Sequence, residues 1–453
     1  MVAFYTRVRT ALMLTAAGTA LLIALGAGLG VPSTQSVMPT SRPPPVRREI
    51  LRAKLTSTQV LAGEQDLAVM IQMPAFRAHD REQRRALSII VVLDRSASMR
   101  GDPLANAKRA ATSLIAQLDD GDSFAVVTFS DRDELVIAAG KASPERKHAA
   151  SEAIDRIVAG GGTCASCGII RGEHEILQSP DLRGIHRMVF ISDGQANLGI
   201  RSQDELVELA GRTAEHGVSI STVGVGLDFD EETLIRIGET AHGNYYFAKD
   251  TAQLGTVFAT ELTGLRRIIA THVSLLALQE DGNPIERAYG YPLQTIKRGV
   301  VVPIADLGDE EARKVVLHGL VTAREVGSYQ LTWIDPADGN VHSARTTLAT
   351  TITKDPARVA ATRDAEATAA VEQARVARAI DQSVTVYEHV GAAAAEAMIQ
   401  HSLRDGHITD QAALRGAEAA MTSYEAAGPE AAGPEAKKSV RALAYDLARA
   451  PTD

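Results

Sequence analysis

The sequence has few cysteines, few aromatic residues and no excess of positive charge. Of its 453 residues only two are cysteine and 4% are aromatic. Two cysteines are too few for a disulfide-rich scaffold or for a zinc module built on several cysteines. The 47 basic and 56 acidic residues give a formal net charge of −9, which argues against nucleic acid as the main partner. The 45% of apolar residues nevertheless exclude a chain that is disordered throughout.

Several common catalytic motifs are also missing. The chain contains no Gly-x-x-x-x-Gly-Lys-Ser/Thr loop for a nucleotide, no His-Glu-x-x-His zinc motif and no Gly-x-Ser-x-Gly nucleophile elbow. Its twelve histidines show no spacing typical of metal ligands. We therefore expect a protein that binds no nucleotide and is not an enzyme.

An apolar N-terminal segment dominates residues 1–31. Residues 11–31 carry no charged side chain, and Arg7 and Arg9 precede them. A run of this length can cross a bilayer as a helix, with its basic side in the cytoplasm. The alternative is a secretory signal that is cleaved after the small residues near Gly26. Under both interpretations the bulk of the chain is exported, either anchored in the cell membrane or released as a secreted or periplasmic protein.

Residues 32–48 are rich in proline and serine and contain few large apolar side chains. Such a composition predicts an extended linker. Beyond it, residues 85–265 alternate predicted buried strands, such as Ile89–Leu93 and Arg187–Ser192, with helical patterns. Strands that alternate with helices predict an α/β fold with a doubly wound, mostly parallel sheet.

The segments that flank this α/β region have different patterns. Apolar residues alternate with polar ones in residues 49–84 and again in residues 266–354, where turn residues separate the runs. We expect both segments to form one β-sandwich into which the α/β domain is inserted. The alternative is that the N-terminal strands extend the α/β sheet. Residues 355–453 are alanine-rich and predict a helical region, interrupted at Gly391, that packs on the sandwich as a hairpin.

Three predicted loops at one edge of the α/β sheet carry oxygen side chains. Asp94, Ser96 and Ser98 follow one buried strand, Asp193 follows another, and Thr163 follows three glycines. Open α/β sheets bind ligands at the carboxyl ends of their strands, where these loops lie. Two carboxylates and three hydroxyls suit a hard divalent cation such as Mg²⁺ and nearly balance its charge. A carboxylate from a partner protein could then fill an open coordination position.

The pattern Asp94-x-Ser96-x-Ser98, together with Thr163 and Ser192-Asp193-Gly194, resembles the metal-ion-dependent adhesion site of von Willebrand factor type A (VWA) domains. The similar region covers about residues 85–265. The whole layout resembles bacterial membrane-anchored or secreted members of this family. The resemblance implies that these five residues bind Mg²⁺ or Mn²⁺, with Ca²⁺ as a further candidate, directly or through water. It also implies a protein ligand that supplies an acidic residue, and usually no catalysis.

Two other functions stay open at this point. The chain could be a structural subunit of an envelope complex that uses the fold for assembly and leaves the cation site idle. It could also be a phosphoester hydrolase with Asp94 as the nucleophile. That chemistry usually has a second carboxylate two residues later, where this sequence has Ser96.

The sequence departs from similar bacterial domains directly after Thr163. Cys164 stands where those domains often have asparagine, and with Cys167 it forms a Cys-x-x-Cys motif at a predicted helix start. In an exported domain a disulfide is one interpretation. Unpaired thiols, redox activity and metal binding are the others.

Overall fold

The computed structural model describes residues 50–72, 86–179, 184–193, 195–225, 230–248, 251–279, 284–321, 325–427 and 434–449. The predicted signal anchor (1–31) and linker (32–48) lie outside these ranges. Within the ranges, none of the helices combines the length and the hydrophobicity that a membrane crossing requires.

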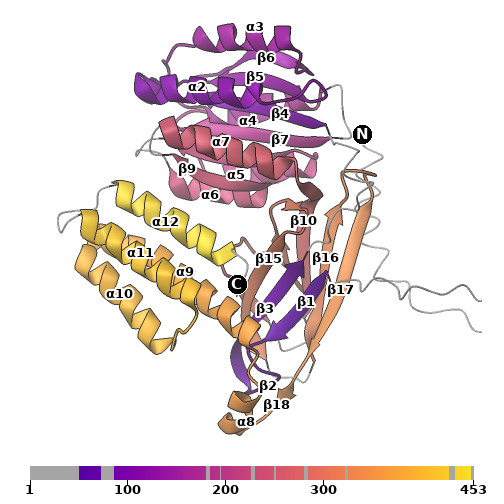
Figure 1. Cartoon of the computed structure of the whole chain (residues 1–453), viewed down its shortest axis with the longest axis vertical. Helices are drawn as coiled ribbons and strands as arrows, with labels where there is room; N and C mark the ends of the chain where they lie inside the picture. Colours follow the sequence, from indigo (N-terminus) through magenta and orange to yellow (C-terminus); the bar gives the residue numbers. More distant parts are fainter. Residues whose placement is uncertain are drawn as a thin grey trace, which may run out of the picture. The chain divides into compact units, whose positions relative to one another are not determined.

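A six-stranded sheet with helices on both faces forms the α/β domain (Figure 1). Its strand order is β6–β5–β4–β7–β8–β9, and every neighbouring pair is parallel except β5 and β6. The strands are β4 (Leu87–Asp94), β5 (Ser123–Phe129), β6 (Asp133–Lys141), β7 (Ile185–Ser192), β8 (Ser219–Val225) and β9 (His242–Ala248). The predicted α/β fold with a mostly parallel sheet is confirmed, whereas the antiparallel edge strand β6 was not predicted.

The helices of this domain divide between the two faces of the sheet. One face is covered by α2 (Asp102–Ala116), α3 (Pro144–Asp155) and α7 (Thr251–Leu265). The other face is covered by α4 (Ala165–Ile176), α5 (Gln203–Glu215) and α6 (Glu231–Thr240).

All eight residues of β4 are buried between these two layers. Ile89, Val91 and Leu93 contribute to one hydrophobic core, and Ile90 and Val92 to the other. Because successive side chains of a strand point to opposite faces, a central strand with helices on both sides is apolar on both faces along its middle, as in Ile89–Leu93. Each such side chain stabilises the fold by about 1.5–3 kcal/mol when fully buried.

The second domain is a β-sandwich of two antiparallel sheets. One sheet has the order β1–β3–β15–β11, and the other the order β12–β13–β10–β16–β17, with β14 paired to β10. The strands of the first sheet are β1 (Leu51–Leu55), β3 (Gly63–Gln72), β11 (Ile285–Ala288) and β15 (Ala312–Val321). Those of the second are β10 (Ile268–Gln279), β12 (Gln294–Ile296), β13 (Gly299–Pro303), β14 (Leu307–Gly308), β16 (Glu325–Ile334) and β17 (Val341–Ala349).

Strands from before and after the α/β domain share the first of these sheets. Strand β3 pairs along its whole length with β15, from Gly63 beside Val321 to Gln72 beside Ala312. A short parallel pair of β2 (Gln59–Val60) and β18 (Thr351–Ile352) adds a further link between the two segments. The N-terminal strands therefore pair with the sandwich and not with the α/β sheet.

The C-terminal region is helical, as predicted, and contains α8 (Pro356–Ala361), α9 (Ala365–His389), α10 (Ala392–Asp405), α11 (Gln411–Ala427) and α12 (Pro434–Arg449). Gly391 separates α9 from α10 with a φ of 110°, a conformation that favours glycine. Helices α9 to α12 bury a common core of mostly alanine, valine and tyrosine side chains.

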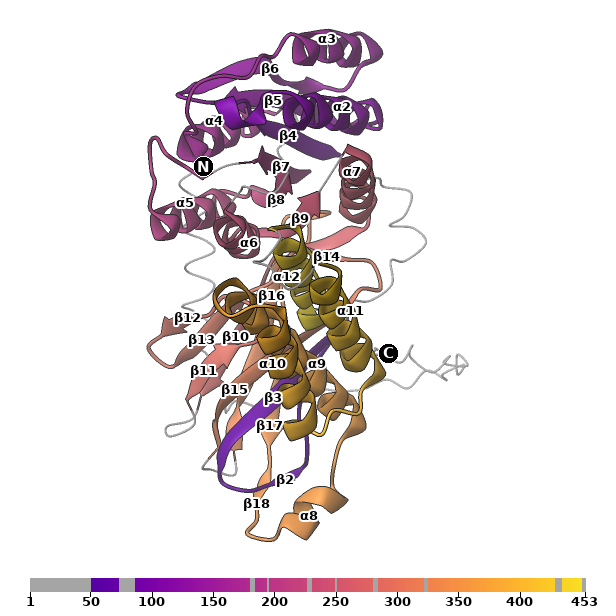
Figure 2. The ribbon, with the colours of Figure 1, turned by 90° about the vertical axis from the view of Figure 1, so that its left-hand side faces the viewer.

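The helical region contacts the sandwich, on which the sequence predicted a packed hairpin, and also the α/β domain. Arg375 of α9 donates to the buried carboxylate of Asp66 in β3, with an Nε–Oδ2 distance of 2.7 Å. Helix α12 lies beside the α/β domain (Figure 2), where the backbone N–H of Tyr245 donates to the hydroxyl of Tyr445 at 3.3 Å. Such contacts depend on side chains that are far apart in the sequence, so the hydrophobic pattern alone could not predict them.

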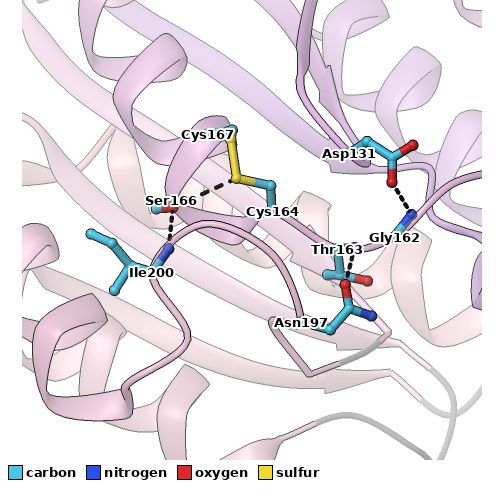
Figure 3. The surroundings of a disulfide bond; sticks show 8 residues. All are labelled: Asp131, Gly162, Thr163, Cys164, Ser166, Cys167, Asn197 and Ile200. Carbon is cyan, nitrogen blue, oxygen red and sulfur yellow. Dashed lines mark hydrogen bonds between the residues drawn. A yellow bond between two sulfur atoms is a disulfide. The ribbon is translucent and has the colours of Figure 1, made fainter.

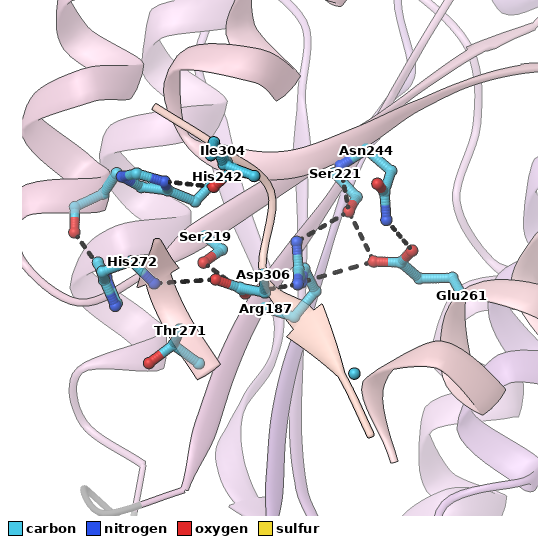
Figure 4. A network of polar contacts seen from close by, with 12 residues as sticks. Arg187, Ser219, Ser221, His242, Asn244, Glu261, Thr271, His272, Ile304 and Asp306 are labelled. Atoms are coloured by element: carbon cyan, nitrogen blue, oxygen red, sulfur yellow. Dashed lines mark hydrogen bonds and ion pairs between the residues drawn. The ribbon is translucent and has the colours of Figure 1, made fainter. Parts of the chain in front are cut away.

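A buried polar network joins the α/β domain to the sandwich (Figure 4). Its centre is the side chain of Arg187, near the start of β7. Arg187 is only 1% exposed. Arg187 Nη2 donates to Asp306 Oδ2 at 2.8 Å, and its Nε lies 3.5 Å from Glu261 Oε1. Asp306 lies between β13 and β14 and also accepts from the hydroxyl of Ser219 at 3.0 Å and the backbone N–H of His272 at 3.0 Å. The arginine thus pairs with carboxylates from both domains.

Two histidine rings lie at the same junction, with their centroids 5.5 Å apart. His242 Nδ1 donates to the carbonyl of Ile304 at 2.8 Å, and His272 Nε2 donates to the carbonyl of Ala214 at 3.0 Å. Burial lowers the pKa of both rings, that of His272 to about 4. Both histidines are therefore neutral at pH 7.

Candidate metal centre

The first loop of the candidate site begins where β4 ends. The carboxylate of Asp94 is fully buried, and its Oδ1 accepts from the backbone N–H of Ser96 at 2.8 Å. This bond turns the chain sharply after the strand, in the manner of an Asx turn. The turn leads into the short 3-10 helix η1 (Ala97–Met99), which the buried side chain of Met99 anchors in the core. Asp94, Ser96 and Ser98 are thereby held together in a compact loop.

Hydrogen bonds connect this loop to the end of β7. The hydroxyl of Ser98 lies 2.9 Å from that of Ser96 and donates to Asp193 Oδ1 at 2.8 Å. The hydroxyl of Ser192 donates to Asp94 Oδ2 at 2.7 Å. Four of the five residues predicted from the sequence are thus brought together. Ser192 was not predicted as a site residue, although its position at the end of the strand next to β4 is the signal that could have identified it.

The glycine loop that carries Thr163 is attached to the first loop through the backbone. The N–H of Gly160 donates to the carbonyl of Arg95 at 2.8 Å, and the N–H of Ala97 donates to the carbonyl of Gly161 at 3.0 Å. A Cβ atom at Gly161 would lie 2.9 Å from the carboxylate of Asp131, in a residue whose φ is 83°. Glycine is therefore required for the loop to approach so closely.

Thr163 itself is 3% exposed. Within the described ranges, the hydrogen bonds that hold Thr163 use its backbone. Its N–H donates to Asn197 Oδ1 at 2.8 Å (Figure 3). Its carbonyl accepts from the N–H groups of Asn197 and Leu198. Asn197, which the sequence did not single out, thus ties the Thr163 loop to the segment that follows Asp193. Three loops meet at the carboxyl edge of the sheet, as the sequence predicts for a ligand site.

The electrostatics of Asp94 fit a cation site. Burial raises the pKa of Asp94, while the hydrogen bonds from Ser192 and Ser96 lower it. In the described part of the chain no lysine or arginine forms an ion pair with Asp94, and the adjacent Arg95 pairs with Glu134 at 3.3 Å instead. A buried carboxylate with only neutral partners carries an uncompensated desolvation cost. A divalent cation would compensate this cost, and the carboxylates and hydroxyls present are the oxygen ligands that such an ion prefers.

Comparisons with known proteins identify the α/β domain. The family model of the von Willebrand factor type A domain matches residues 88–260. The chain is 27% identical over 202 residues to the protein sll0103 of Synechocystis, a match that covers 45% of this chain and 47% of that protein. It is also 27% identical over 211 residues to YfbK of Escherichia coli, covering 46% of this chain and 36% of that protein. The chain therefore spans less than half the length of either relative.

A solved structure described as "von Willebrand factor type A from Catenulispora acidiphila" is similar over a much larger region. The two structures superpose with a TM-score of 0.68 at 16% identity, covering 87% of this chain and 96% of the other. At this identity the similarity concerns the fold, and it includes regions outside the α/β domain. The chain thus contains a von Willebrand factor type A domain, in the region that the sequence assigned to it.

Proposed function

We propose that the VWA domain binds a divalent cation through Asp94, Ser96, Ser98, Thr163 and Asp193, and that a carboxylate of a protein partner completes the coordination. Domains of this family commonly mediate protein–protein interactions and are generally not enzymes. The observation that supports the cation is the fully buried Asp94 carboxylate, whose partners in the described residues are neutral donors. The oxygen-only ligand set favours Mg²⁺, and it would also accept Mn²⁺ or Ca²⁺.

We also propose that the chain works outside the cytoplasm. The support is the uncharged run at residues 11–31 and the basic residues before it. The run would anchor the chain in the cell membrane, or would be cleaved as a signal and release a secreted or periplasmic protein. Fractionation of cells that express the full chain, followed by N-terminal sequencing of the mature protein, distinguishes these two cases. A full-length chain in the cytosol would contradict both.

Titration of the purified full chain with Mn²⁺ and Mg²⁺ in a calorimeter tests the cation site. We expect saturable binding of one ion, lost in Asp94→Ala and at least tenfold weaker in Ser98→Ala. Ser423→Ala is the matched control, because the hydroxyl of this serine donates to the carbonyl of Ala419 within its own helix α11. An unchanged affinity in Asp94→Ala, or no binding by the wild type, would reject the site.

Capture of partners from an envelope extract, with and without chelator, tests the bridging role. We expect partners that are lost when either chelator or Asp94→Ala removes the cation. Partners that persist under both conditions would instead favour a structural subunit whose cation site is idle. Turnover of phosphoesters that disappears in Asp94→Asn would favour the hydrolase.

A further inference from the structure

We propose that the disulfide between Cys164 and Cys167 is a redox-sensitive element of the candidate metal centre, and that its reduction by a dithiol weakens cation binding. The inference rests on the proposed function, because it concerns the same three loops. Its physical basis is the position of the disulfide between the loop that carries Thr163 and the loop that follows Asp193.

The disulfide lies at the first turn of α4, directly after Thr163. Cys164 is the N-cap residue of this helix, and its sulfur is bonded to that of Cys167 three residues later. A crosslink that closes so short a loop removes little conformational entropy from the unfolded chain compared with one that closes a long loop. Its main effect is therefore local, on the backbone that positions Thr163.

The segment that follows Asp193 packs directly on this disulfide. A Cβ atom at Gly199 would lie only 2.6 Å from Cys164 Sγ and 2.6 Å from Ser166 Oγ. Ser166 Oγ also lies 3.7 Å from Cys164 Sγ and accepts from the backbone N–H of Ile200 at 3.1 Å (Figure 3). Two residues before Gly199, the Asn197 side chain and backbone hold Thr163. The contacts of the disulfide and those of Thr163 thus belong to one continuous stretch of chain.

The opposite side of the same turn is also fixed. The backbone N–H of Cys164 donates to the carbonyl of Ser130 at 2.7 Å, and Asp131 next to it accepts from the N–H of Gly162 at 2.6 Å. A movement of the Cys164 backbone would therefore disturb the glycine loop as well. Two thiols occupy more space than one sulfur–sulfur bond, and close-packed surroundings transmit such a change to neighbouring groups. Cys164 is 1% exposed, and the backbone of Gly199 packs closely on its sulfur.

The half-buried Cys167 is the sulfur that a reductant can approach more easily. A thiolate of the dithiol attacks Cys167 Sγ, the Cys164–Cys167 bond breaks, and Cys164 leaves as a thiolate that takes up a proton. The second thiol of the reagent, as a thiolate, then attacks the reagent sulfur of the mixed disulfide and releases Cys167, which also becomes a thiol. Two electrons and two protons pass to the protein, and the reagent leaves as its own disulfide.

The experiment measures Mn²⁺ affinity of the full chain before and after treatment with dithiothreitol, with the reagent removed anaerobically. We expect about a tenfold loss of affinity on reduction and recovery after reoxidation. Amide hydrogen exchange of residues 160–163 and 195–200, measured in chelator, should accelerate in the reduced chain. The double variant Cys164→Ser/Cys167→Ser should bind Mn²⁺ like the reduced chain and should not respond to dithiothreitol. Ser166→Ala keeps the disulfide but lacks the bond to Ile200, and it should lose affinity by a smaller factor.

Circular dichroism of the reduced chain and the double variant checks that both remain folded. Equal Mn²⁺ affinity and equal hydrogen exchange in the oxidised and reduced chains would overturn the redox proposal alone. Absence of Mn²⁺ binding by the oxidised chain would overturn the proposed function, and the redox proposal with it. Failure of the native chain to gain two thiols on reduction, while the unfolded chain gains them, would also overturn the redox proposal.

Discussion

The two ends of the VWA sheet both bury carboxylates, but they compensate the charge differently. Strand β7 reaches both ends, with Arg187 near its start and Ser192 as its last residue. At the start, Arg187 pairs with Glu261 and Asp306. At the other end, Ser192 and the backbone of Ser96 give Asp94 neutral hydrogen bonds. The arginine end joins the two domains through paired charges, whereas the buried carboxylate at the serine end has only neutral partners among the described residues.

We expect the largest loss in the free energy of unfolding from Asp306→Asn, at the end of the sheet where Arg187 lies. This substitution removes the closest charge partner of a buried guanidinium, and breaking a buried ion pair costs about 3–5 kcal/mol. Urea denaturation of the full chain measures the change, with Asp405→Asn on the exposed surface of α10 as the control. A loss below about 1 kcal/mol, the size of one ordinary hydrogen bond, would show that the joint does not depend on this charge.

The second prediction is that the free energy of unfolding depends on pH through His272, which lies beside the Arg187 network. Burial lowers the pKa of His272 from 6.5 to about 4, so between these values the unfolded chain binds a proton that the folded chain does not. Stability therefore falls as the pH decreases from 6.5 towards 4, by up to about 3 kcal/mol from this group. Burial beside His242 and Arg187 lowers the pKa, and Asp306 opposes this effect.

Denaturation curves at several pH values between 7.5 and 4.5 test this dependence. The slope of stability against pH should be shallower in His272→Gln than in the wild type. His389→Gln, at the exposed end of α9, should keep the wild-type slope. Identical slopes in all three proteins would mean that His272 does not contribute.

We expect the smallest change in the free energy of unfolding from Asp94→Asn, measured in metal-free buffer with chelator. Because no charged partner of Asp94 is found among the described residues, the neutral amide should change stability by no more than about 1 kcal/mol. The same urea denaturation assay measures this change. Because the assay is the same, the result can be compared directly with that of Asp306→Asn. A loss as large as that of Asp306→Asn would mean that the two ends of the sheet do not differ in this way.

The sequence predicted those strands and helices in which buried apolar residues are continuous or recur at a regular spacing. Strand β4 is buried at every position and apolar from Ile89 to Leu93, and the helices around it bury one face, so both were recognised. Strands β6 and β17 were not, because no residue of β6 and only one residue of β17 is buried, so neither shows the continuous buried run of a central strand. Both lie at the edge of their sheets, where one side lacks a neighbouring strand.

The candidate site was predictable because its side chains follow strands that end at one edge of a parallel sheet. Asp94 and Asp193 could be placed together from that rule alone. The partnership of Arg187 with Asp306 could not, since 119 positions separate the two residues and neither has a local motif. Asn197 likewise gives no sequence signal, because its role is to hold a backbone group of another loop.

The insertion of the VWA domain between β3 and β10 has a mechanical consequence. A domain joined to its neighbour by one linker can swing about that linker, whereas this one is tethered at both of its ends to strands of the same sandwich. The ion pairs of Arg187 with Glu261 and Asp306 add a third, non-covalent attachment between the VWA domain and the sandwich. A pull on the Asp94 edge of the sheet would therefore be carried to the sandwich through several attachments and would not rotate the domain about a single hinge.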